Sequence, residues 1–166
     1  MKAESVEVRE ADFADPSDGA AIVALLDSYA SDPVGGGRPL DPDVRARLVP
    51  GLGSHPTALV LLAFRGARPV GIATCFFGFS TFSARPLLNV HDLAVVPECR
   101  GGGIGRRLLE AAEARARARG CCKLTLEVQD DNRRARGLYA SFGFVDFVVA
   151  GSATRFLTKP LVSPDG

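Results

Sequence analysis

A strand followed by a glycine-rich turn and a helix constrains this chain most. Residues 87–96 read LLNVHDLAVV, an apolar run whose length and β-branched content favour a strand buried on both faces. Pro97 ends that strand, and four glycines follow at positions 101, 102, 103 and 105. The next residues predict a helix up to Gly120, a residue free to take the positive φ of a helix C-cap. The expected buried stripe of this helix is Ile104, Leu108, Leu109, Ala112 and Ala116.

This strand–turn–helix unit has the properties of an anion site. The first amides of a helix lack an internal partner, and the helix dipole places roughly half a positive charge there. Glycines let a phosphate approach the backbone without meeting a Cβ atom. Arg100 and Arg106 flank the turn and can add charge-assisted hydrogen bonds. An ordinary strand-to-helix connection needs one glycine, so four glycines between two arginines favour a phosphate ligand.

The spacing of the turn residues separates the classes of phosphate ligand. The loop of nucleoside-triphosphate enzymes is absent from the sequence. A dinucleotide fingerprint counted from Gly101 would need glycine at Arg106, although Glu127 stands near the offset of the ribose-binding acid. A nicotinamide enzyme that binds NAD is therefore an alternative with an incomplete motif. The spacing present is Arg100-x-x-Gly103-x-Gly105.

Length and charge limit the domain count and the partners. With 166 residues and a net charge of +1, we expect one domain over residues 1–160 and a flexible tail over 161–166. The balanced charge argues against nucleic acid and anionic membranes as partners. The N-terminus lacks the apolar core of a signal peptide, and the apolar run Ala58–Phe64 is too short to span a bilayer. A cytoplasmic protein is expected.

The four cysteines do not indicate a metal site. No CxxC pair and no His/Cys ligand spacing occurs in the sequence. Cys75, Cys121 and Cys122 lie in or beside apolar segments and are expected to be small core residues. Cys99 lies in the glycine-rich turn and is expected to be exposed.

Hydrophobic periodicity and turn signals predict the remaining elements. The strand after the main helix should pair in parallel with the strand at residues 87–96 through a right-handed crossover. Four phenylalanines, at positions 76, 77, 79 and 82, are expected mostly in the core, with one or two available to wall a substrate cleft. The predicted elements are a strand Ser5–Glu10, a helix over Ala20–Ala30 that starts near Asp15, a loop Asp32–Pro39, a helix from Pro42 to about Leu52, strands Ala58–Arg65, Pro69–Phe79 and Lys123–Val128, a helix from Asn132 to about Phe142 ended by Gly143, and a closing hairpin of Phe144–Val149 and Ala153–Thr158 around Gly151.

Two motifs together resemble the GNAT superfamily of N-acetyltransferases. Arg100-x-x-Gly103-x-Gly105 resembles the acetyl-CoA pyrophosphate loop of that superfamily. Asn132-x-x-Ala135-x-x-Leu138-Tyr139-x-x-x-Gly143-Phe144 resembles its second motif at the appropriate distance, and the resemblance covers roughly residues 57–147. It implies an α/β (α+β) fold: a mixed, mostly antiparallel central sheet of six to seven strands with a splayed parallel pair, and helices on both faces.

The resemblance implies acetyl-CoA as co-substrate and no metal. Residues 100–106 would hold the pyrophosphate, backbone amides around Leu93–Val95 would pair with the pantetheine arm, and one such amide would donate to the thioester oxygen. Tyr139 would reach the sulfur. The cofactor-binding residues implied are Leu93, Ala94, Val95, Arg100, Gly101, Gly102, Gly103, Ile104, Gly105, Arg106, Asn132 and Ala135.

The proton balance of amine acetylation calls for a base and an acid. An alkylammonium group of pKa about 10.4 is deprotonated only to a few parts in ten thousand at pH 7, a penalty of about 4–5 kcal/mol. His91, Asp92 or a water channel could take that proton, and Tyr139 could donate to the leaving thiolate. Adjacent strand residues face opposite sides, so only one of His91 and Asp92 should face the cleft unless a bulge intervenes.

The acceptor follows from a comparison within the superfamily. The stretch FSTFSARPLLNVHDLAVVPECRG resembles the diamine (polyamine-type) branch, which typically has Glu-Asp where this chain has His91-Asp92. The histidine removes a negative charge that would attract a polycation, so the expected acceptor is a primary amine of a small amine or amino-acid-like molecule. In this superfamily the segment between the first two helices commonly lines the acceptor site, and the closing hairpin often pairs in homodimers. The alternative is a non-catalytic acyl-CoA sensor that tolerates Tyr139→Phe and His91→Ala.

Overall fold

The computed structural model of the protein describes residues 5–161. The chain divides into two compact units, one ending at Leu126 and one beginning at Glu127. The predicted tail over 161–166 lies outside the described residues except for Leu161.

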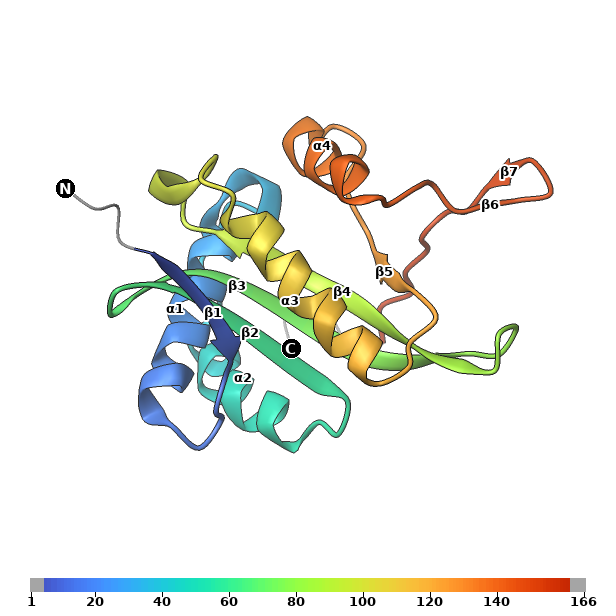
Figure 1. The fold of residues 1–166 in the computed structure, drawn as a ribbon. Helices are drawn as coiled ribbons and strands as arrows, with labels where there is room; N and C mark the ends of the chain where they lie inside the picture. Colours follow the sequence, from blue (N-terminus) through green and yellow to red (C-terminus); the bar gives the residue numbers. More distant parts are fainter. Residues whose placement is uncertain (1–4, 162–166) are drawn as a thin grey trace. The chain divides into compact units, whose positions relative to one another are not determined.

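The first unit is built on one five-stranded sheet (Figure 1). Its spatial order is sequential, and every pairing is antiparallel except that of β4 with β5, which is parallel. The mixed, mostly antiparallel sheet and its one parallel pair are thus as predicted, but this sheet has five strands rather than six to seven. The strands are β1 (Val6–Glu10), β2 (Ala58–Arg65), β3 (Arg68–Ser80), β4 (Arg85–Val95) and β5 (Leu124–Leu126).

Helix starts and ends in this unit follow from local sequence. Asp15 caps the first helix by accepting a hydrogen bond from the Ser17 amide, and proline occupies the first turn of both α1 and α2. The predicted loop Asp32–Pro39 contains one short 3-10 turn. The helices are α1 (Pro16–Ser31), η1 (Pro33–Gly35), α2 (Pro42–Ser54), η2 (Pro97–Cys99) and α3 (Ile104–Ala118).

The two faces of the sheet are covered by different helices. On one face, all five residues of the predicted α3 stripe are buried, and Gly71 lies so close that an added Cβ would be 3.1 Å from side-chain atoms of both Ile104 and Leu108. On the other face, α1 contributes Ile22 and Leu25 to a core cluster with Ile72. Since Gly71 and Ile72 are neighbours in β3, they mark opposite faces. Helices therefore cover both sides, as predicted.

Several burial predictions were wrong. Cys99 is buried rather than exposed, whereas Cys122 is exposed and Cys121 only partly buried. Phe79 and Phe82 are exposed, because they lie at the end of the long β3–β4 hairpin beyond the helices. In β4 full burial is limited to Leu88 and Val90, so this strand is not buried on both faces along its length.

The second unit consists of a helix and a small hairpin. The helix α4 (Arg133–Phe142) is capped by Asn132, whose Oδ1 accepts from the Ala135 amide at 3.1 Å, and it ends at Gly143 with a φ of 103°. The predicted hairpin exists but is short: β6 (Val148–Val149) and β7 (Ser152–Ala153) form a separate two-stranded sheet. The remainder of the predicted strands Phe144–Val149 and Ala153–Thr158 is irregular.

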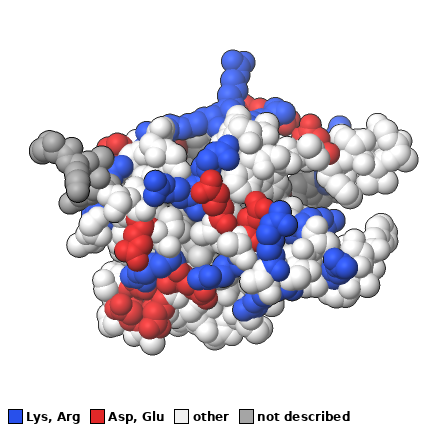
Figure 2. All heavy atoms as spheres, viewed as in Figure 1, with Lys and Arg blue, Asp and Glu red and all other residues white. Residues whose placement is uncertain are grey.

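The surface mixes charges of both signs. On the face shown in Figure 2, basic and acidic side chains are interspersed. Arg115 of α3 pairs with Glu10, and Arg117 pairs with Glu113 one turn away. Within residues 5–161, none of the helices combines the length and apolar character needed to cross a bilayer.

Candidate active site

The glycine-rich loop leaves the first amides of α3 without a side-chain cap. Gly103 is the N-cap residue, with φ 77° and ψ 6°, and glycine has no side chain with which to accept a hydrogen bond. Gly101 also has a positive φ, 80°. A Cβ added at Gly103 would meet no atom within 4 Å, so the space beside the helix start is open. This geometry suits an anion held by first-turn amides.

Arg100 ties this loop to the end of α1. Its Nη2 donates to Asp32 Oδ2 at 2.7 Å and its Nε donates to the Val95 carbonyl at 3.0 Å. The Arg100 hydrogen bond and the Val34 amide hold the pKa of the Asp32 carboxyl below its ordinary value. Sequence reasoning missed Asp32, because nothing local marks a partner 68 positions away. The phosphate role of Arg100 stays a prediction.

The edge of β4 opens before the strand ends. In the described residues β5 pairs with β4 only from Leu88 to Val90, whereas β4 continues to Val95. The Val96 amide donates to Val70 of β3. Successive residues of an antiparallel strand direct their backbone N–H and C=O groups alternately to its two sides. Because Val96 directs its amide to β3, Leu93 and Val95 direct their backbone groups to the open edge. The Val95 carbonyl there is taken by Arg100, which leaves its amide for a ligand.

A β-bulge brings His91 and Asp92 to the same face of the sheet. Val90 pairs with Cys75 and Asp92 with Thr74, so His91 is the additional residue in β4. Asp92 shares the face of its partner Thr74, and the ring of His91 meets Phe76 edge-on with the centroids 5.6 Å apart. Thr74 and Phe76 are two residues apart and share a face. The sequence predicted that His91 and Asp92 could share a face only if a bulge intervened, and this bulge is present.

The surroundings of Asp92 favour its protonated form. Burial raises the pKa of Asp92, while the nearby His91 charge and the Thr74 hydroxyl act in the opposite direction. Thr74 is only 2% exposed, and its Oγ1 makes no hydrogen bond of normal geometry in the described structure. Burial, followed by the charges of Asp92 and Asp32, raises the pKa of the Tyr29 phenol from α1. Tyr29 and Thr74 carried no sequence signal of a site role.

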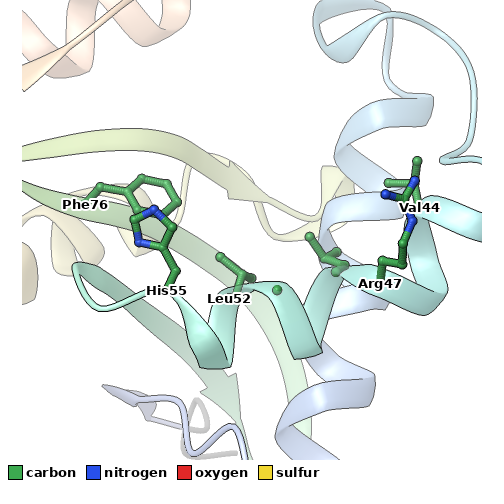
Figure 3. Close-up of a pocket in the computed structure, with 7 residues that line it drawn as sticks. Val44, Arg47, Leu52, His55 and Phe76 are labelled. Atoms are coloured by element: carbon green, nitrogen blue, oxygen red, sulfur yellow. The ribbon is translucent and has the colours of Figure 1, made fainter. Parts of the chain in front are cut away.

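A pocket of about 380 Å³ lies beside this group (Figure 3). Phe76 forms one wall and meets His55, at the end of α2, edge-on with the centroids 5.1 Å apart. Because Phe76 also contacts His91, it stands between the pocket and the predicted base. The expectation that a phenylalanine of this cluster would wall a cleft fits Phe76. The lining residues are Val44, Arg47, Leu48, Gly51, Leu52, His55 and Phe76.

The second predicted motif lies on α4. Asn132, Ala135 and Tyr139 are all partly buried, and Tyr139 meets Phe144 edge-on at 5.7 Å between centroids. The Asn132 oxygen serves as the helix cap. The cofactor roles of Asn132 and Ala135 and the acid role of Tyr139 stay predictions. Among residues 5–161, no three His, Cys, Asp or Glu side chains are grouped so that they could hold a metal ion.

Comparisons with known proteins agree on one family. The family model described as "Acetyltransferase (GNAT) family" matches residues 21–144. An uncharacterized N-acetyltransferase of Bacillus subtilis, YhfO, is 34% identical over 134 residues, which span 77% of this chain and 84% of the relative. Bovine (Bos taurus) thialysine N-epsilon-acetyltransferase is 36% identical over 86 residues, which span 52% of this chain but only 50% of that enzyme.

The solved structures show the same fold at low identity. An aminoglycoside acetyltransferase from an uncultured soil metagenomic sample superposes with a TM-score of 0.75 at 18% identity, covering 93% of this chain and 97% of the other. With the family match over most of the chain, these findings extend what the loop and the open strand edge indicate. The protein belongs to the GNAT family and is an acetyl-transferring enzyme.

Proposed function

We propose that the protein transfers the acetyl group of acetyl-CoA to a primary amine of a small molecule, by direct attack in a ternary complex. The observation that carries this proposal is the open edge of β4, which runs from the last β5 pairing at Val90 to Val95 and then into the uncapped start of α3. Pantetheine needs strand-like amide partners and the diphosphate needs a cluster of donors. This segment offers both in one continuous stretch of chain.

The co-substrate contacts follow from that stretch. The backbone groups of Leu93 and Val95, which are directed to the open edge, pair with pantetheine or orient its thioester, whereas Ala94 between them directs its backbone groups to β3. The loop Gly101–Gly103 and the first-turn amides of Ile104, Gly105 and Arg106 hold the diphosphate. Arg100 positions the loop through Asp32 and Val95. The conformations of Gly101 and Gly103, both with positive φ, support this assignment.

The bulge supplies the candidates for the base. His91 is exposed and touches the pocket wall Phe76, whereas Asp92 is partly buried with a raised pKa. We assign proton removal from the ammonium group to His91, whose neutral ring has a nitrogen that can accept a proton, and assign to the ionised form of Asp92 the stabilisation of the resulting imidazolium. A water chain at the same place is the alternative route for the proton.

Tyr139 completes the proton balance. The thiolate that leaves from acetyl-CoA has a pKa of about 8.5, and a phenol of pKa about 10 can donate to it. The support for this role is the motif that Tyr139 shares with the family. Asn132 and Ala135 of the same helix face would then contact the pantetheine arm. Because the family match runs from residue 21 to 144, we also propose that both units belong to one acetyltransferase domain.

The acceptor is a small amine or an amino-acid-like molecule. One relative, similar over about half of each chain, is named for N-epsilon acetylation of thialysine, and this supports a side-chain amine of an amino acid as one acceptor type. His91 in place of a carboxylate argues against acceptors that need a second cation held at this position. The cytoplasm supplies both substrates, and we place the enzyme there.

Single-turnover transfer from radiolabelled acetyl-CoA to a panel of primary amines tests the function. We expect an acetylated product with at least one amine, and about 10²- to 10⁴-fold slower transfer by Tyr139→Phe. The aromatic ring retained in the variant preserves the contact with Phe144, so this variant isolates the hydroxyl. Binding of CoA without transfer to any amine would contradict the enzyme and support an acyl-CoA sensor.

A further inference from the structure

The chemistry of the pocket differs from that of a polyamine site. Its walls are mostly aliphatic and aromatic side chains of α2 and β3, and among the lining residues that the structure describes, Arg47 carries a permanent charge. Among residues 5–161, no carboxylate lines it. An ammonium group placed at the Arg47 end would therefore meet a cation, and the nearby Asp43 carboxylate is already paired with that cation. At about 380 Å³ the pocket is near the lower end of the range of roughly 300–1,000 Å³ for small-molecule sites.

The pocket has two chemically distinct ends, as Figure 3 shows. His55 and Phe76 lie together at one end, and Arg47 and Val44 lie at the other. The Phe76 end adjoins His91 through the ring contact at 5.6 Å. An elongated acceptor whose amine is to reach His91 must place that amine at the Phe76 end and its opposite terminus toward Arg47.

Arg47 is available to a ligand in spite of an ion pair. Its Nη2 lies 2.7 Å from Asp43 Oδ2 one turn earlier in α2, but the two side chains are 71% and 77% exposed. Exposed pairs of this kind hold their partners weakly. A ligand carboxylate that reaches the apolar pocket can compete with Asp43 or share the guanidinium with it, because arginine offers five donors.

We propose that this pocket selects acceptors with an apolar body and a carboxylate at the end opposite the reacting amine, and disfavours diamines. The inference rests on the proposed function and specifies its substrate class. The apolar body packs against Leu48, Leu52 and Phe76, the carboxylate pairs with Arg47, and the amine lies beside His91. Transfer then forms the amide bond and releases CoA thiol, with the ammonium proton leaving through the base at the bulge.

A matched series of amines tests the proposal. Heptylamine, 1,6-hexanediamine and 7-aminoheptanoate share a chain of six methylene groups between the reacting amine and a terminal methyl, ammonium or carboxylate, and differ only in that terminal group. Acetylated product is quantified by mass spectrometry, which avoids reaction of thiol reagents with the exposed Cys122. For the wild type we expect kcat/KM to fall from the carboxylate to the methyl to the ammonium compound, with about tenfold between the extremes.

Variants of α2 test whether the acceptor preference comes from Arg47 in the pocket or from the overall positive charge of the helix. Arg47→Gln should lower the ratio of kcat/KM for 7-aminoheptanoate to kcat/KM for heptylamine to nearly one, and Asp43→Asn should increase that ratio. Arg45→Gln is the matched control, since Arg45 carries the same charge on the same helix but does not line the pocket. Circular dichroism checks that each variant is folded.

The possible outcomes distinguish failure of the proposed acceptor preference from failure of the proposed acetyltransferase function. Preference for the diamine, or an order that Arg47→Gln leaves unchanged, would overturn the proposal while the acetyltransferase function stands. Acetylation of other amines but of none of the three would also overturn it. If no amine of any kind is acetylated, the proposed function fails, and this inference fails with it.

Discussion

The two faces of the β3–β4 strand pair are built from the same segment of chain but have different chemistry. On the α3 face β3 presents Gly71, Ala73 and Cys75, all buried and small, so α3 packs close to the sheet. Burial there raises the pKa of the Cys75 thiol to about 12, which makes it unreactive. On the other face the same strands present Thr74, Phe76 and the pair His91 and Asp92.

One additional residue accounts for much of that difference. Regular alternation would send His91 and Asp92 to opposite faces, and one of them would then be directed at the α3 core. The bulge places both beside Phe76 and Thr74, so no ionisable side chain of this pair enters the close-packed face. The comparison teaches that one face is packed closely against a helix while the other carries the side chains to which we assign catalytic roles, and the following predictions test that division.

The largest expected effect is a loss of activity from a change on the face that carries His91 and Asp92. His91→Gln should lower kcat/KM by about 10²- to 10⁴-fold because it removes the proposed base. The side chain is exposed, so the thermal midpoint should change little. Steady-state kinetics with a good acceptor, together with thermal unfolding, measures both. An unchanged rate in this variant and in Asp92→Asn would show that a water chain carries the proton.

A cavity on the α3 face should lower the stability of the fold and leave the catalytic rate nearly unchanged. Leu108 is fully buried between α3 and the sheet, and Leu108→Ala should lower the free energy of unfolding by about 2–5 kcal/mol. Denaturant unfolding measures the loss. The rate per folded molecule should stay near that of the wild type, and a selective loss of activity at full stability would contradict the division between the faces.

Adding a methyl group to the same closely packed face should lower the free energy of unfolding by less than the Leu108→Ala cavity does. In Gly71→Ala the new Cβ would lie 3.1 Å from Ile104 Cγ2 and Leu108 Cδ1 and 3.2 Å from the Ala94 carbonyl. We expect a loss of about 1–3 kcal/mol in unfolding free energy. Gly51→Ala is the control for stability, because Gly51 lies in the last turn of α2 and an added Cβ would meet nothing within 4 Å. That variant should be as stable as the wild type or up to about 1 kcal/mol more stable.

The smallest effect concerns the pH dependence of stability. Since burial raises the folded-state pKa of Asp92, the folded state binds its proton more tightly than the unfolded chain does. The stabilisation is present below the ordinary aspartate pKa of about 3.9 and is lost as the pH rises through the raised value. Asp92→Asn should therefore be slightly more stable than the wild type at neutral pH. A variant that is less stable there would show that the ionised Asp92 is well compensated.

Local sequence signals predicted the parts of the molecule that local physics determines. These signals lie within one or two turns of the feature that they predict. They include the buried stripe of α3, the positive φ at Gly120, the helix end at Gly143 and the cap at Asn132. The parallel pairing of β4 with β5 followed from the order strand, helix, strand along the chain. The residues of the site could be nominated from motifs, and their roles are still predictions.

Features that depend on distant contacts could not be predicted. The Arg100–Asp32 pair joins segments 68 positions apart, and Cys99 is buried by tertiary packing although its own neighbours suggest a surface turn. The sequence allowed a bulge at His91 but could not require one, because the register between β3 and β4 is set across the whole hairpin. Phe79 and Phe82 were misassigned because the hairpin extends beyond its covering helices.

Calorimetric titration with coenzyme A tests the central claim most directly, and pantetheine, which lacks the diphosphate, is the matched ligand. If the open edge of β4 and the uncapped amides of α3 bind the two parts of the molecule, coenzyme A should bind at one site and pantetheine much more weakly. Gly103→Val, which adds a side chain at a residue with φ 77°, should weaken coenzyme A more than pantetheine. Equal affinities for both ligands, or no heat with coenzyme A, would contradict the account.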